Sequence, residues 1–242
     1  MGRDRGDHPG HGTVLTPLTE LPMELAGLHR GVAVGRSVRR RRPPACDPIR
    51  WADLVEGAGF QEAGRGWLKR QRTLADTVDD GMRLLVCGLN PSLHAADAGV
   101  GFVSPGNRFW PAARAAGLVP ADRDPGAALR AGGGMTDLVK RATPRAVEVT
   151  RAEYEHGLAR VARLVDWLRP GGVCFVGLAG WRAAVDRRAE PGLQARGLGG
   201  RPVYVMPSTS GLNARVPVGE LADHLRRAAA FTEGVLAPRF CS

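Results

Sequence analysis

The chain has 242 residues, 43% of them hydrophobic, and a formal net charge of +10. This is enough apolar material for one sizeable core plus a tail, and no apolar stretch approaches the roughly 20 residues of a membrane-spanning helix, so we expect neither a membrane protein nor a secretory signal. The excess of positive charge favours an anionic partner, nucleic acid before an anionic membrane. Lys69 and Lys140 are the only lysines among the 34 basic residues, and so strong an arginine bias can partly reflect a GC-rich genome.

The four cysteines, Cys46, Cys87, Cys174 and Cys241, are widely separated along the chain. Structural zinc and iron–sulfur sites usually include a close pair of cysteines, so we expect neither a metal nor another cofactor. Cys87 and Cys174 lie inside apolar runs and are predicted to be buried thiols. Free thiols indicate a reducing compartment, and we expect a cytoplasmic protein.

Residues 1–46 are predicted to form a basic, flexible N-terminal arm, with one short helix over residues 15–29. Four consecutive arginines followed by two prolines, over residues 39–44, indicate an extended basic segment. Such an arm could be disordered, could result from an upstream start codon, or could contact phosphates without sequence preference. Residues 47–80 read as a helical lead-in, with helices expected around residues 51–55 and 67–77.

The apolar run at residues 83–89 predicts a buried strand, which must stop at Pro91 because proline lacks a backbone N–H. Asn90 therefore lies at the carboxyl end of a central strand, where ligands bind in open α/β sheets. Residues 93–101 are expected to form a flexible loop, and Asn107 is a good cap for the helix that follows it.

Strands and helices alternate in the second half of the chain. Thr150 and Glu153 form a capping box that opens an amphipathic helix ending before residues 170–172. The other elements are predicted in the following order: a short helix at 125–131, a strand at 173–177, a helix at 179–189, a strand at 203–206 and a helix at 217–234. This alternation predicts an α/β fold, a three-layer α/β/α sandwich with a short, mostly parallel sheet, over residues 81–236.

Two of these strands end in similar loops, one at residues 88–92 and one at residues 205–212. In a parallel sheet both endings lie at the same edge, so both loops can line one cleft. Neither loop contains the glycine-rich sequences that cradle triphosphates or dinucleotides, and such ligands are not expected.

Four sequence blocks resemble the mismatch-specific uracil-DNA glycosylase and thymine-DNA glycosylase family, within the uracil-DNA glycosylase superfamily. In chain order they are Gly88–Ser92, Pro105–Trp110, Gly134–Thr143 and Met206–Asn213. The resemblance implies a DNA repair enzyme, a monofunctional glycosylase of the bacterial, nucleoid-associated kind, acting as a monomer without cofactor. It implies that a pyrimidine flips out of double-stranded DNA at a G·U or G·T mismatch before water cleaves its N-glycosidic bond.

The resemblance also implies the site. Asn90 takes the place of the asparagine that positions the attacking water, and Phe102 that of the aromatic on which the flipped base stacks. The residues expected to contact the base are Leu89, Phe102, Asn107 and Ser208. Those expected at the DNA backbone and as the wedge that replaces the flipped base are Ser210, Gly211, Leu212 and Arg215, the last displaced by one position from the family's arginine.

Alternatives remain for several of these residues. Asp137 could be a second carboxylate that activates water or could cap the following turn, and Phe102 could be a core aromatic. Ser208 and Ser210 could only stabilise the turn after their strand, and Arg215 could be a solvated surface charge. The second motif reads Ser208-Thr209-Ser210, which leaves the preference between uracil and thymine open.

Two other functions compete with the glycosylase. One is a non-catalytic nucleic-acid-binding protein on the same fold, which would bind DNA or RNA without forming an abasic product. The other is an unrelated α/β hydrolase or nucleotide-binding protein, which would bind a mononucleotide and have no affinity for DNA.

Overall fold

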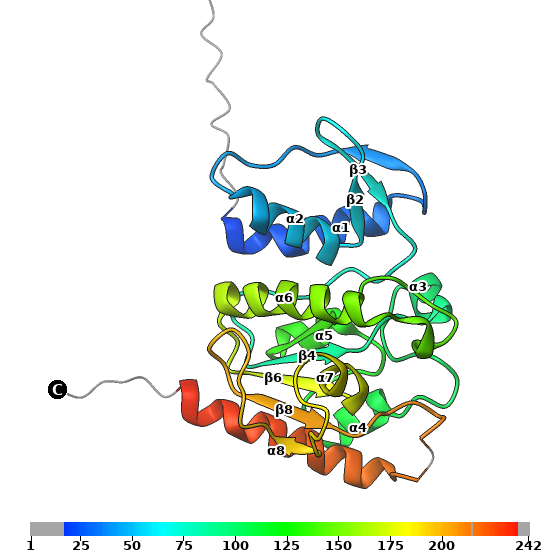
Figure 1. Ribbon diagram of the computed structural model, residues 1–242, viewed down its shortest axis with the longest axis vertical. Helices are drawn as coiled ribbons and strands as arrows, with labels where there is room; N and C mark the ends of the chain where they lie inside the picture. The colour runs from blue at the N-terminus through cyan, green and yellow to red at the C-terminus, as the bar shows by residue number, and fades with distance from the viewer. Residues whose placement is uncertain (1–16, 214, 237–242) are drawn as a thin grey trace, which may run out of the picture.

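The computed structural model describes residues 17–213 and 215–236. It has a small N-terminal module, residues 17–70, stacked on a larger α/β domain (Figure 1). The larger domain is a three-layer α/β/α sandwich, as expected, with helices on both faces of a central sheet.

The central sheet has five strands in the order β5-β4-β6-β8-β7, of which the first four are parallel and β7 is antiparallel. Their bounds are Leu84–Gly88 for β4, Gly133–Asp137 for β5, Gly172–Val176 for β6, Gly192–Leu193 for β7 and Val203–Met206 for β8. Every residue of β4, β6 and β8 is buried, which agrees with the near-continuous apolar runs in the sequence. The strand β5 was not expected from its sequence, which contains two glycines.

One face of the sheet is covered by α6 (Arg151–Leu168) and α7 (Leu178–Ala184), which pack on side chains such as Leu85 and Phe175. The predicted capping box opens α6: the Thr150 hydroxyl accepts a hydrogen bond from the Glu153 N–H, and the Glu153 carboxylate accepts one from the Thr150 N–H. The other face is covered by α4 (Phe109–Ala115) and α8 (Val218–Leu236).

Shorter elements complete the α/β domain. The helix α5 (Pro125–Arg130) packs on the edge strand β5, and the 3-10 turn η2 (Ala146–Glu148) precedes α6. The helix α3 spans Leu93–Ala98, where a flexible loop was expected. Ser92 explains the difference, because its side chain accepts a hydrogen bond from the Ala95 N–H and caps the helix.

The N-terminal module corrects the expected flexible arm for residues 17–46; residues 1–16 lie outside the described part of the chain. It contains η1 (Leu18–Glu20), α1 (Leu21–Gly31), α2 (Pro48–Gly57) and a sheet of order β1-β3-β2. The strands are Ser37–Arg39 for β1, Phe60–Glu62 for β2 and Trp67–Arg70 for β3, so the helix expected at 67–77 is wrong. Apolar side chains from α1, α2 and the sheet form a core of their own.

The module lies over the outer side of α6 in Figure 1. The Asp53 carboxylate of α2 accepts hydrogen bonds of 2.6 and 2.8 Å from the Arg163 guanidinium of α6. Trp167 of α6 packs against the module core, and the Arg50 guanidinium lies 4.8 Å from its ring centroid. Among the described helices, none combines the length and apolar character that a membrane crossing requires.

Candidate active site

The loops after β4 and β6 leave the sheet toward opposite faces. The chain after β4 continues to α4 on one face, and the chain after β6 enters α7 on the other. Where neighbouring connections separate in this way, a crevice opens at the carboxyl edge of a parallel sheet. The candidate residues of the first and last motifs lie at this edge.

Asp137 and Phe102 meet above Gly88, the last residue of β4. Gly88 is paired with Asp137 of β5 in the parallel register. A Cβ atom at Gly88 would lie 2.3 Å from Asp137 Oδ1 and 3.3 Å from Phe102 Cζ. The absence of a side chain at this position is therefore what lets the carboxylate and the aromatic ring approach each other.

Phe102 is half-buried and adopts a φ of 60°, which is uncommon for an aromatic residue. Its ring stacks on Phe109, with the ring centroids 4.2 Å apart, so one of its faces is covered. The same ring lines a pocket with Met135, Thr136 and Asp137. Phe102 thus combines the two alternatives, since it packs on the core and also borders a pocket beside a carboxylate.

The side-chain amide of Asn90 is held by the segment after β5. Asn90 Nδ2 donates to Thr143 Oγ1 at 2.8 Å and to the Arg141 carbonyl at 3.0 Å. Within the described chain, Oδ1 of Asn90 receives no hydrogen bond, so this oxygen is available to accept one from a water. The sharp stop at Pro91 and these two bonds fix the side chain in one orientation.

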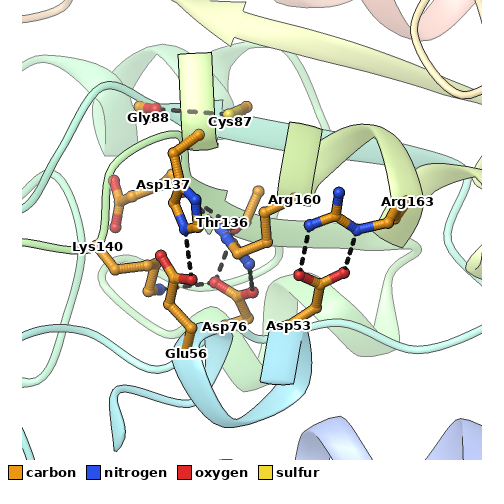
Figure 2. Close-up of polar contacts among 11 residues, drawn as sticks. Asp53, Glu56, Asp76, Cys87, Gly88, Thr136, Asp137, Lys140, Arg160 and Arg163 are labelled. Atoms are coloured by element: carbon orange, nitrogen blue, oxygen red, sulfur yellow. Dashed lines mark hydrogen bonds and ion pairs between the residues drawn. The ribbon is translucent and has the colours of Figure 1, made fainter. Parts of the chain in front are cut away.

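A buried ionic network lies beneath Asp137 (Figure 2). Asp76 Oδ1 accepts hydrogen bonds from Lys140 Nζ and Thr136 Oγ1, both at 2.7 Å, and Asp76 Oδ2 accepts one from Arg160 Nη1 at 2.8 Å. Arg160 also donates to the Asp137 carbonyl at 2.8 Å. The exposed fractions of Asp76, Lys140 and Arg160 are 4%, 6% and 0%.

This network fixes the backbone of Asp137 and sets the charges around its carboxylate. The pKa of Asp137 is raised from 3.8 to about 6, chiefly by burial and also by Asp76, against the lowering effect of Lys140 and Arg160. The pKa of Asp76 is shifted in the opposite direction, because the attraction of Arg160 and Lys140 exceeds the cost of its burial. A carboxylate with a pKa near neutrality is suited to accept a proton from water.

The loop after β8 is organised by Arg108. Its backbone N–H donates to the Thr209 carbonyl at 2.9 Å, and its guanidinium donates to the Ser210 carbonyl at 3.1 Å and to the carbonyls of Asn213 and Val216. Gly211 packs against the neighbouring turn, since a Cβ there would lie 3.2 Å from the carbonyl oxygens of residues 105 and 106.

The serines of this loop stabilise its turn. Ser208 Oγ accepts from the Ser210 N–H at 3.3 Å, and Ser210 Oγ accepts from the Leu212 N–H at the same distance. Leu212 is 98% exposed at the tip, and Arg215 is also exposed. An apolar side chain held outward on a braced turn has the form of an inserted wedge.

Leu89 and Asn107 stand apart from this arrangement. The Leu89 side chain points to the opposite face from Phe102, where a Cβ at Gly180 would lie 2.9 Å from Leu89 Cδ1. The Leu89 side chain therefore does not line the pocket beside Phe102, and its carbonyl accepts a hydrogen bond from the Val139 N–H at 2.9 Å. Asn107 Oδ1 accepts from the Phe109 N–H at 3.0 Å and so binds the first residue of α4, but the N-cap position itself is held by Arg108 and not by Asn107 as expected.

Sequence reasoning missed Gly88, Arg108 and Thr143 as parts of the site. All three lie inside the quoted motif blocks or at their ends, and that position was the available signal. Their roles depend on contacts with other segments, which the blocks do not reveal. The side chains that the structure describes include no group of three or more His, Cys, Asp or Glu placed to hold a metal ion.

The chain also matches a model of a known protein family. The model described as the uracil DNA glycosylase superfamily matches residues 75–229. The match begins near the end of the N-terminal module and covers all five strands of the central sheet.

Proposed function

The chain belongs to the uracil DNA glycosylase superfamily, a group of DNA glycosylases that act on damaged bases, and from this premise we propose that it excises uracil, and also thymine, opposite guanine. The observation that carries the finer proposal is the presence, in one sequence, of a neutral amide at Asn90 and serines at positions 208 and 210. The four motif blocks resemble mismatch-specific and thymine-type glycosylases at these positions.

The reaction begins with extrusion of the base. Flipping costs a few kcal/mol, and less where mismatched pairing is already weak, which favours G·U and G·T pairs. Leu212 enters the vacated stack, and the extruded base lies against Phe102. Stacking of one base on an aromatic side chain contributes about 1–3 kcal/mol, which offsets much of the cost of flipping.

Water then replaces the base at the sugar. Asn90 Oδ1 orients a water toward C1′, and the ionised carboxylate of Asp137 accepts one of its protons. The water oxygen bonds to C1′ while the N-glycosidic bond breaks, and the electron pair of that bond leaves with the base. The products are an abasic site and a free base, which takes up a proton.

A labelled duplex with a central G·U or G·T pair, followed by alkaline cleavage of abasic sites, tests this proposal. We expect cleavage by the wild type and a large loss in Asn90→Ala. Since Asp137 must be ionised, the excision rate should increase as the pH is raised, with an apparent pKa of about 6. The rate of Asp137→Asn should not show this increase. An intact strand at enzyme excess, with duplex binding retained, would instead indicate a non-catalytic nucleic-acid-binding protein.

The proposal extends to cellular context. We propose that the protein acts as a monomer in the bacterial cytoplasm, in association with the nucleoid. Size-exclusion chromatography with light scattering, with and without a mismatched duplex, tests the first point, and fractionation of cells with a tagged chain tests the second.

A further inference from the structure

The N-terminal module has a groove lined largely by basic residues and bordered by Trp67, outside the region that matches the superfamily. It runs between the segment after β1 and the β2–β3 hairpin. The lining residues are Arg40, Arg41, Arg42, Pro48, Trp51, Glu62, Gly64, Arg65, Gly66, Trp67 and Leu68. Trp67 is 45% exposed, whereas Trp51, the other tryptophan of this lining, is buried.

Positive charge around Trp67 is largely uncompensated. Arg39 pairs directly with Trp67 across β1 and β3, and Arg41 crosses the hairpin, with its Cγ 2.7 Å from where a Cβ at Gly66 would lie. Among the described residues, Arg39, Arg41, Arg65 and Lys69 form no ion pair.

Part of the groove is neutralised within the module. Arg40 is paired with Glu24, at 2.9 Å. Glu62 accepts a hydrogen bond from Trp51 Nε1 at 2.7 Å. Arg39, which is paired with Trp67, and Lys69, two residues along β3, lie on the same exposed face of the sheet as Trp67.

We propose that this groove binds single-stranded nucleic acid, with a base stacked on Trp67 and phosphates on the guanidiniums of Arg41 and Arg65. Exposed aromatic rings beside a basic groove are the combination that single strands require, because every unpaired base offers a flat face and every linkage a negative charge. A paired base presents no such face to Trp67. A membrane surface would require a large exposed apolar area. Of the described residues that line this groove, Trp67 is the one large apolar side chain that is exposed.

The inference does not depend on which base the enzyme excises, since it concerns binding to undamaged strands. Fluorescence anisotropy with a labelled, lesion-free oligothymidylate of about 16 nucleotides measures it directly. Trp67→Ala should weaken binding about 5- to 150-fold, the range for loss of one stacked base, and Trp67→Phe should restore most of it. Thermal unfolding of both variants checks that the module stays folded.

The charges are tested by a matched pair of double variants. Arg41→Ala/Arg65→Ala should reduce the slope of log K against log salt by about 1.4, since each contact with a single strand contributes about 0.7. Arg188→Ala/Arg196→Ala removes the same charge from exposed positions away from the groove and should leave the slope nearly unchanged.

Wild-type affinity in Trp67→Ala would overturn the proposal, and so would an equal loss of slope in both double variants. Binding to anionic vesicles that depends on Trp67, with oligonucleotide binding unaffected, would overturn it in favour of a membrane surface. Loss of binding in Trp67→Ala together with normal excision from a short G·U duplex would support it. Absence of excision in every form, with Trp67-dependent binding retained, would count against the proposed function alone.

Discussion

Replacing Asp137 with asparagine should stabilise the protein at neutral pH while it removes activity. Burial raises the pKa of Asp137 from 3.8 to about 6 in the folded protein. Between these two values the unfolded chain releases the proton while the folded protein keeps it, so the free energy of unfolding falls as the pH rises. Above about pH 6 the loss is complete and constant.

The size of this effect follows from the two pKa values. The difference between 3.8 and about 6, at about 1.4 kcal/mol per pH unit, corresponds to about 3 kcal/mol. Asparagine has nearly the same shape as aspartate and does not titrate, so the free energy of unfolding of Asp137→Asn should not decrease in this way. The variant should unfold about 6–12 °C above the wild type at pH 8, because 1 kcal/mol shifts the melting temperature by about 2–4 °C in a protein of this size.

Calorimetric melts of both proteins at pH 4 and pH 8 test this expectation. The difference in stability between variant and wild type should be small at pH 4 and near its full value at pH 8. Contributions from groups that do not interact with Asp137 are common to both proteins and cancel in the difference. A difference that is independent of pH, or a less stable variant at pH 8, would refute the assignment of a raised pKa to Asp137.

Three other substitutions give sharp outcomes. Gly88→Ala places a methyl group 2.3 Å from Asp137 Oδ1 and should displace the carboxylate, so the excision rate at pH 8 should fall to that of Asp137→Asn. If the double variant Gly88→Ala/Asp137→Asn were slower than either single variant, Gly88→Ala would not act through Asp137 alone. Asp76→Ala leaves the buried cations of Lys140 and Arg160 without a counter-charge and should cost about 3–5 kcal/mol in urea unfolding; a cost below about 1 kcal/mol would mean that water enters the network. Leu212→Ala should change stability by less than about 0.5 kcal/mol because the side chain is 98% exposed. The same change should slow excision from a mismatched duplex but not from a single strand, and equal slowing of both would argue against a wedge.

Local sequence patterns were sufficient where a segment carries its own signals. The strands β4, β6 and β8 are apolar runs bounded by turn residues, and all were predicted within about one residue of their observed bounds. The capping box at Thr150 predicted the start of α6. These elements alone implied a parallel sheet with helices on both faces, which the structure and the superfamily match confirm.

Segments without such signals became regular only through their neighbours. Residues 133–137 contain two glycines and an aspartate, yet they form β5 because β4 offers an unpaired edge. The module over residues 17–70 was divided between an arm and a lead-in, since its core joins helices and strands that are distant in the chain. Short-range periodicity contains no information about such pairings.

The chain by itself determined which residues could carry the chemistry: an amide before a proline, an aspartate in the third motif and a small-residue turn after the last parallel strand. Only the tertiary structure decided the contacts, burial and neighbouring charges of these residues. The pairing of Gly88 with Asp137 puts the carboxylate against Phe102, and Arg160, placed on what reads as a polar position of α6, is fully buried beneath it. Charge and burial act through space, so the proton affinity of Asp137 depends on burial and on Lys140, three residues away, and also on Asp76 and Arg160, which lie more than 20 residues away along the chain.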